Sequence, residues 1–272
     1  MSAASLWHRF NSCFRYLFSA SSRHGIHSPF MYEFYCKVLL DMNYYPVYNS
    51  IARFRHSLEH DESWLSKKEL GAGSNAGLTT RRLLRKEAKH SGIPADYGRL
   101  LYRIVRHFQP RYALELGTSL GLSAFYQAAA MAQNSGSEFV SIEGCSDTHQ
   151  AATRNLNAIA PELGIDHFVQ FRLGDFNDEL PKVLKEWPRL DYVFIDGDHR
   201  EERLLHYFRL CLQKVNENSV IAVDDIYWSP GMTRAWQAIK QMPEVRQTAD
   251  LYRFGLVFFR KSAAPQHFIL KF

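Results

Sequence analysis

A glycine turn between an apolar run and a helix-compatible stretch is the first feature that could bind a ligand. Residues 113–116 (ALEL) are apolar apart from Glu115, and the turn continues through Gly117 and Ser119 to Gly121. The spacing is ExGxxxG, in which Ser119 stands where a dinucleotide-binding turn has the glycine that lets the backbone approach a pyrophosphate. The turn therefore favours a ligand without a pyrophosphate.

Acidic residues close the next two β-rich runs. Glu143 ends residues 139–143 (FVSIE), where an acid usually accepts the hydroxyl groups of a ribose. Gly174 and Asp175 follow the third run, and Asp175 could hold an adenine or simply cap the next helix. Because open α/β sheets bind ligands beyond the carboxyl ends of their strands, we expect these residues and the turn to form one binding site.

The elements that must position these residues alternate regularly from about residue 111 onward. β-rich runs are expected at residues 112–116, 139–142, 168–172, 192–195, 220–223 and 255–259. Helix-compatible stretches are expected at residues 122–133, 148–160, 177–185, 201–214 and 231–241. This alternation predicts an α/β fold with a doubly wound, mostly parallel, seven-stranded sheet of the Rossmann-like type.

The first part of the chain lacks this alternation. We expect a basic, helical N-terminal extension or lid over residues 1–91 and a main domain over residues 92–272. The first segment of this extension has apolar residues at helical spacing: Trp7, Phe10, Phe14 and Leu17. Such a helix could touch a membrane, but packing on the main domain or on a second subunit of a homodimer is favoured. The glycine-rich residues 69–74 (ELGAGS) follow no apolar strand, which favours a helix-ending turn over a ligand site.

The composition is typical of a folded protein, since 46% of the 272 residues are apolar and 22% are charged. Residues 1–110 carry 16 Lys and Arg against 8 Asp and Glu, whereas the remaining residues carry 17 against 20. Four scattered cysteines without a CxxC pair argue against disulfides and structural zinc, which favours a cytoplasmic location. No apolar run reaches the roughly 18 residues that predict a transmembrane segment.

Four stretches resemble class I S-adenosylmethionine-dependent methyltransferases, and most closely their catechol and caffeoyl-CoA O-methyltransferase branch. They are LELGTSLGLSA, FVSIEG, DYVFIDGDH and SVIAVDDIYWSPG, in this order within residues 113–260. The resemblance implies the methyltransferase fold, S-adenosylmethionine as cofactor and an activity of class EC 2.1.1. The residues then expected at the cofactor are Glu115, Gly117, Thr118, Ser119, Gly121, Glu143, Gly174, Asp175 and Asp196.

The resemblance also implies a divalent cation, which that branch holds with an Asp after the fourth strand and an Asp-Asn pair after the fifth. The matching residues here are Asp196, Asp224 and Asp225. Such hard oxygen ligands suit Mg²⁺ or Mn²⁺. Asp225 stands in place of the Asn, and three carboxylates overcompensate a divalent ion, so the use of a metal stays open.

His199 occupies the position of the catalytic Lys of that branch, three residues after Asp196. An imidazole with a pKa of ~6.5 can accept a hydroxyl proton at neutral pH, so His199 and Asp196 are the expected catalytic residues. A metal ligand and a helix cap are the other interpretations of His199. Trp228 and Met232, after the fifth strand, are expected to contact the acceptor.

Together these features predict an O-methyltransferase that acts on a hydroxyl group of a small molecule, assisted by a cation, a His base or both. The alternative is an RNA (tRNA) methyltransferase whose basic N-terminal region binds phosphates. Nucleic acid is not favoured, because the basic residues form no clear stripe. A binding module without activity is a third class, and the intact acidic and glycine positions argue against it.

Overall fold

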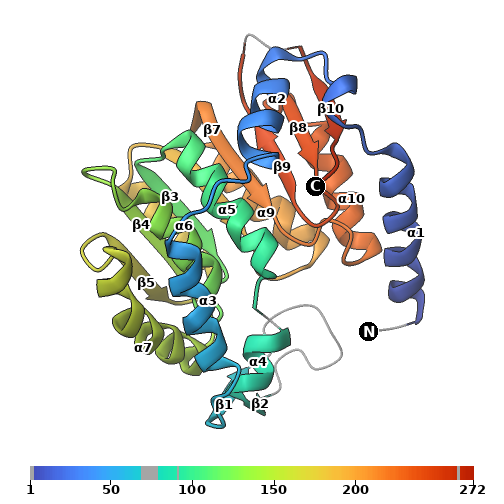
Figure 1. Cartoon of the computed structure of the whole chain (residues 1–272). Coiled ribbons are helices and arrows are strands. Elements are labelled where there is room, and N and C mark those ends of the chain that lie inside the picture. The colour runs from blue at the N-terminus through green and yellow to red at the C-terminus, as the bar shows by residue number, and fades with distance from the viewer. Residues whose placement is uncertain (1–2, 69–78, 91, 262–263) are drawn as a thin grey trace. The chain divides into compact units, whose positions relative to one another are not determined.

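The computed structural model describes residues 3–68, 79–90, 92–261 and 264–272 (Figure 1). The glycine-rich turn at residues 69–74 lies outside these ranges. The chain forms two compact units, one of Met1–Cys36 with Val183–Phe272 and the other of Lys37–Lys182. The segment expected as an N-terminal extension is therefore shared between the two units, and the proposed division after residue 91 stays a prediction.

The first unit contains the last strands of the chain together with its first helices. Its strands are β6 (Leu190–Ile195), β7 (Val215–Val223), β8 (Gln247–Asp250), β9 (Gly255–Phe258) and β10 (Gln266–Ile269). They are ordered β10-β8-β9-β7-β6, with β9 antiparallel to both neighbours and the other pairs parallel. The helices are α1 (Ala3–Ser19), η1 (Arg23–Gly25), α2 (Pro29–Phe34), α9 (Glu201–Leu212) and α10 (Pro230–Lys240).

The second unit places three parallel strands between helices. These strands are β3 (Tyr112–Leu116), β4 (Glu138–Glu143) and β5 (Val169–Leu173), in this order. The helices are α3 (Val47–Leu58), α4 (Leu84–His90), α5 (Ala95–Phe108), α6 (Leu122–Met131) and α7 (Ser146–Leu163). A separate antiparallel hairpin pairs β1 (Trp64–Lys68) with β2 (Thr79–Leu83). Two further helical elements, η2 (Tyr35–Leu39) and α8 (Phe176–Glu186), cross the boundaries between the units.

The expected alternation is confirmed, because all six β-rich runs form strands and all five intervening stretches contain helices. Besides the hairpin, the described strands number eight rather than the expected seven. Strands β8 and β10 were not predicted because their sequences, QTAD and QHFI, have only four residues each, of which at least half are polar. Tertiary pairing, rather than local propensity, makes them strands.

The first 110 residues are mainly helical, as expected, and the β1–β2 hairpin is the exception. Within the described ranges, no helix combines the length and the apolar character that crossing a membrane requires.

Candidate functional site

The turn between β3 and α6 is held in a conformation that requires glycine. Gly117 and Gly121 have φ angles of +107° and +89°, and Ser119 between them has a φ of +49°. A Cβ atom on Gly121 would also lie 2.7 Å from Cζ of Phe125. Because residues other than glycine rarely adopt positive φ, Ser119 marks a turn under constraint, as is common where a backbone closes around a ligand.

Glu143 fastens this turn to the end of β4. Its Oε2 accepts a hydrogen bond from the Ser119 amide and its Oε1 accepts one from the Cys145 amide, both at 2.9 Å. Each carboxylate oxygen has a further lone pair, so Glu143 can still accept hydroxyl groups of a ligand. Among the described residues, the buried hydroxyl of Ser119 has no hydrogen-bond partner. The turn thus offers a polar ligand both an acceptor and an unmatched hydroxyl.

Glu115 lies beneath the turn and is completely buried. Gln127 Nε2 donates to its Oε1 at 2.7 Å and Ser141 Oγ donates to its Oε2 at 2.6 Å. Ser141 Oγ is also 2.6 Å from Oγ1 of Thr118, which is fully buried as well. Burial raises the pKa of Glu115 to about 7, although these hydrogen bonds oppose the shift. The geometry gives Glu115 and Thr118 a supporting position, and direct contact with a cofactor stays a prediction for both.

Gly174 and Asp175 follow β5 at the start of α8. Asp175 Oδ1 accepts hydrogen bonds from the backbone and side-chain nitrogens of Asn177, at 2.8 and 2.6 Å. Asp175 therefore makes the helix-capping contacts that the sequence allowed as an alternative. A Cβ atom on Gly174 would lie 2.5 Å from Cγ of Glu179, so a larger residue here would force that side chain to shift.

In the first unit, the ends of β6 and β7 bring the predicted acidic residues together around an arginine. Asp224 is completely buried, and Arg253 in the β8–β9 turn pairs with both of its carboxylate oxygens, at 2.8 and 2.6 Å. Arg253 Nη2 also lies 3.9 Å from Oδ1 of Asp225. The neighbouring carboxylates raise the pKa of Arg253, which outweighs the lowering caused by its burial.

His199 lies beside Asp196, with 3.7 Å between Nε2 of the ring and Oδ1 of the carboxylate. The two side chains are 27% and 21% exposed, so a small molecule can reach both. Burial and, next, the charges of Asp224 and Asp225 raise the pKa of Asp196. A residue in this setting is a candidate for proton transfer.

Trp228 and Met232 occupy different environments. The Trp228 ring is half-buried, and its centroid lies 6.2 Å from that of His199. Its indole also lies 4.7 Å from the guanidinium of Arg9, which comes from α1. Met232 is only 2% exposed, and its amide donates to Oγ of Ser229, the N-cap of α10. Trp228 can therefore meet an acceptor near His199, whereas Met232 packs in the core.

The implied divalent cation fits this arrangement poorly. Arg253 already engages both oxygens of Asp224, and a cation would have to displace it. The part of the chain that the structure describes contains no group of three or more His, Cys, Asp or Glu placed to hold a metal ion. Sequence reasoning missed Arg253, because it belongs to no motif and reaches Asp224 from another turn. Metal binding by Asp196, Asp224 and Asp225 stays a prediction.

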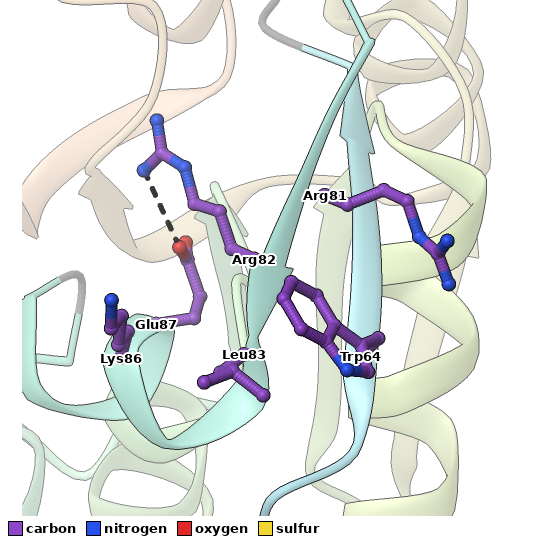
Figure 2. Close-up of a pocket in the computed structure, with 6 residues that line it drawn as sticks. All are labelled: Trp64, Arg81, Arg82, Leu83, Lys86 and Glu87. Carbon is purple, nitrogen blue, oxygen red and sulfur yellow. Dashed lines mark ion pairs between the residues drawn. The ribbon is translucent and has the colours of Figure 1, made fainter.

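A separate basic pocket lies in the second unit, between the hairpin and α4, with a volume of about 420 Å³. Figure 2 shows Arg82 directed toward Glu87 on one side and Arg81 beside Trp64 on the other. The Arg82–Glu87 ion pair measures 3.7 Å, and Glu87 is buried. Lys86 completes the positive lining, so this pocket is where the RNA alternative would find phosphate contacts.

Comparison with known proteins supports the fold. Residues 114–226 match the protein-family model described as "Methyltransferase domain". The flavonoid 3',5'-methyltransferase of Vitis vinifera is 23% identical over 172 residues, which cover 62% of this chain and 66% of the relative. The catechol O-methyltransferase of Niastella koreensis is 27% identical over 142 residues, which cover 50% of this chain and 61% of the relative.

A crystal structure of the SAH-bound Podospora anserina methyltransferase shares the fold. Its TM-score is 0.60 at 12% sequence identity, and the match covers 86% of this chain and 97% of that one. In fold and in these matches the chain is similar to the class I S-adenosylmethionine-dependent methyltransferases. Among these, the chain is a distant homologue of the catechol and caffeoyl-CoA O-methyltransferase branch. The matches span only about 55–69% of the curated relatives' own length.

Proposed function

We propose that the chain transfers a methyl group from S-adenosylmethionine to a hydroxyl oxygen of a small molecule. The observation that carries this proposal is the contact of His199 with Asp196 beside Trp228, at the ends of the strands that bear the acidic residues. The relatives named for flavonoids and for catechol support an acceptor with a hydroxyl group on an aromatic ring.

In this proposal the β3–α6 turn binds the cofactor. Bound S-adenosylmethionine would supply the electrophilic methyl group and carry its own leaving group. Glu143 would accept the ribose hydroxyls, since both its oxygens have spare lone pairs. Ser119 would offer its unmatched hydroxyl to the polar end of the cofactor. The glycines at 117 and 121 keep the backbone in the shape that this contact needs.

His199 would remove the proton from the acceptor hydroxyl as its oxygen bonds to the methyl carbon. Asp196, whose Oδ1 lies 3.7 Å from the ring, would orient His199 and, in its ionised form, would stabilise the imidazolium that forms. Trp228 would form one wall for the acceptor ring. Arg253 supplies the positive charge that faces Asp224.

The test is methyl transfer from radiolabelled S-adenosylmethionine to a panel of catechols and flavonoids. His199→Ala should lower turnover by about 10²–10⁴, while the affinity for S-adenosylhomocysteine stays unchanged. His206→Ala is the matched control, because this exposed histidine lies on α9, the helix that follows His199. Full turnover by the His199 variant would remove the proposed base.

The basic pocket is the observation that favours RNA as a second candidate acceptor. If it binds RNA, the double variant Arg81→Glu, Lys86→Glu should weaken binding and reduce its dependence on salt. A gel-shift titration of tRNA at several salt concentrations measures both. Weak binding that the double variant does not change would leave the small molecule as the acceptor.

A further inference from the structure

Helix α1 turns an apolar face away from the unit to which it belongs. Six large apolar side chains of this single helix are between 53% and 76% exposed: Leu6, Trp7, Phe10, Phe14, Leu17 and Phe18. Two ring pairs continue the surface along the helix, since Trp7 stacks on Phe10 and Phe14 contacts Phe18. We call these six residues the α1 apolar face.

The helix packs on its unit through its other, more polar side. Ser5 Oγ donates to the carbonyl of Trp228 at 3.2 Å, and His8 Nε2 lies 2.8 Å from Oγ1 of Thr233. Farther along, the Tyr16 hydroxyl donates to the Leu270 carbonyl at 2.6 Å. Figure 1 shows α1 alongside α10, the helix that carries Thr233. This inverts the usual amphipathic arrangement, in which the apolar stripe faces the core.

The α1 apolar face exposes a large apolar area to solvent. Fully buried aromatic side chains remove about 150–250 Å² each from water, so four aromatics and two leucines at this exposure present roughly 600–900 Å². The largest apolar patch of a typical monomer measures about 300–600 Å² and often binds a partner. The face is therefore an interaction surface rather than scattered exposure.

The charge around the helix indicates what the face meets. Residues 1–32 contain Arg9, Arg15 and Arg23 and no Asp or Glu, and the first acidic residue is Glu33. Arg15 and Arg23 are exposed, and so is Lys271, whose amide donates to the Ser21 carbonyl just after α1. A second copy of α1 would bring the same positive charges together, whereas an anionic lipid surface would attract them.

We propose that α1 lies in the surface of an anionic lipid bilayer, with the α1 apolar face inserted among the acyl chains. Tryptophan, phenylalanine and leucine beside arginine make up the composition of helices that bind in the plane of a membrane. The polar contacts with Trp228 and Thr233 keep the opposite side of the helix on the protein. This inference does not depend on the proposed methyl transfer.

The experiment is co-sedimentation of the full chain with vesicles of phosphatidylcholine, with or without phosphatidylglycerol. The wild type should sediment with the anionic vesicles, and less with the neutral vesicles or at high salt. The triple variant Trp7→Ser, Phe10→Ser, Phe14→Ser should bind at least about tenfold more weakly. The matched control Leu40→Ser, Met42→Ser, Tyr44→Ser removes three exposed apolar side chains outside α1 and should bind like the wild type.

Circular dichroism establishes that each variant is folded, and Arg15→Glu tests the charge contribution without altering the apolar face. This single substitution should weaken binding to anionic vesicles only. Wild-type protein that stays in the supernatant with anionic vesicles would overturn the proposal. Sedimentation equilibrium tests the alternative. If the wild type is a dimer, the triple variant is a monomer and neither binds vesicles, the α1 apolar face belongs to a dimer interface and the proposal is wrong.

Discussion

Glu115→Gln should change how the stability of the chain depends on pH. The carboxyl group is completely buried, and its pKa is raised from 4.5 to about 7. Glutamine has the shape of the protonated acid: its oxygen can accept from Gln127, and its amide can donate to Ser141. The substitution therefore removes the titration while it keeps the hydrogen bonds that support Thr118.

The magnitude follows from the shift. Below about pH 4.5 both the folded and the unfolded chain hold the proton, so the ionisation of Glu115 does not change the free energy of unfolding. As the pH rises toward 7, the unfolded chain releases the proton while the folded chain keeps it, and the wild type loses stability relative to the variant. A shift from 4.5 to about 7 corresponds to a loss on the order of 3 kcal/mol.

Urea denaturation of both proteins at several pH values between 4.5 and 8 measures this difference. The gap in unfolding free energy should widen through the window and stay constant above it. Glu244→Gln is the control, because this exposed glutamate should give curves parallel to the wild type. Parallel curves for the Glu115 variant would refute the reasoning, and would mean that the buried carboxyl is not held protonated.

Three further results are expected. Gly121→Ala should lower the free energy of unfolding by about 1–3 kcal/mol, because the φ angle here is +89° and the new Cβ would meet Phe125. Unchanged stability in thermal or chemical denaturation would contradict the strained turn. Arg253→Met should lower the free energy of unfolding by about 3–5 kcal/mol, because it leaves the charge of the buried Asp224 without its ion pair. Adding Asp224→Asn should recover part of this loss in the same assay. A chelator should leave methyl transfer unchanged, whereas a loss that Mg²⁺ or Mn²⁺ restores would favour the predicted metal site.

Strands and turns with strong local patterns could be predicted from the sequence. β3, with the sequence YALEL, is buried along its whole length, and the expected glycine turn follows it. Glu143 also lies where an acid at the end of the second strand should lie, next to the turn. In the first case the pattern is local, and in the second the parallel strand order brings the end of β4 beside the turn after β3.

Contacts between distant segments could not be predicted. Arg253 approaches Asp224 from a turn 29 residues later, and neither residue alone signals an ion pair. Ser141 supports Glu115 from the middle of an apolar strand, where a serine reads as an ordinary β residue. The helical period of α1 was visible, but periodicity does not tell which side meets the protein. The side of α1 that meets the protein is set by the contacts of its polar side chains, such as those of Ser5 and His8.

Calorimetric titration with S-adenosylhomocysteine tests whether the β3–α6 turn binds S-adenosylmethionine. The wild type should bind one molecule per chain. Glu143→Ala should lose ~1.5–3 kcal/mol of binding free energy, which is an affinity lower by about 10–150-fold, as expected for a hydrogen bond to a charged group. Glu138→Ala, at the exposed start of the same strand, should bind like the wild type. If the folded wild type does not bind, or if the Glu143 variant binds with equal affinity, the β3–α6 turn is not the cofactor site.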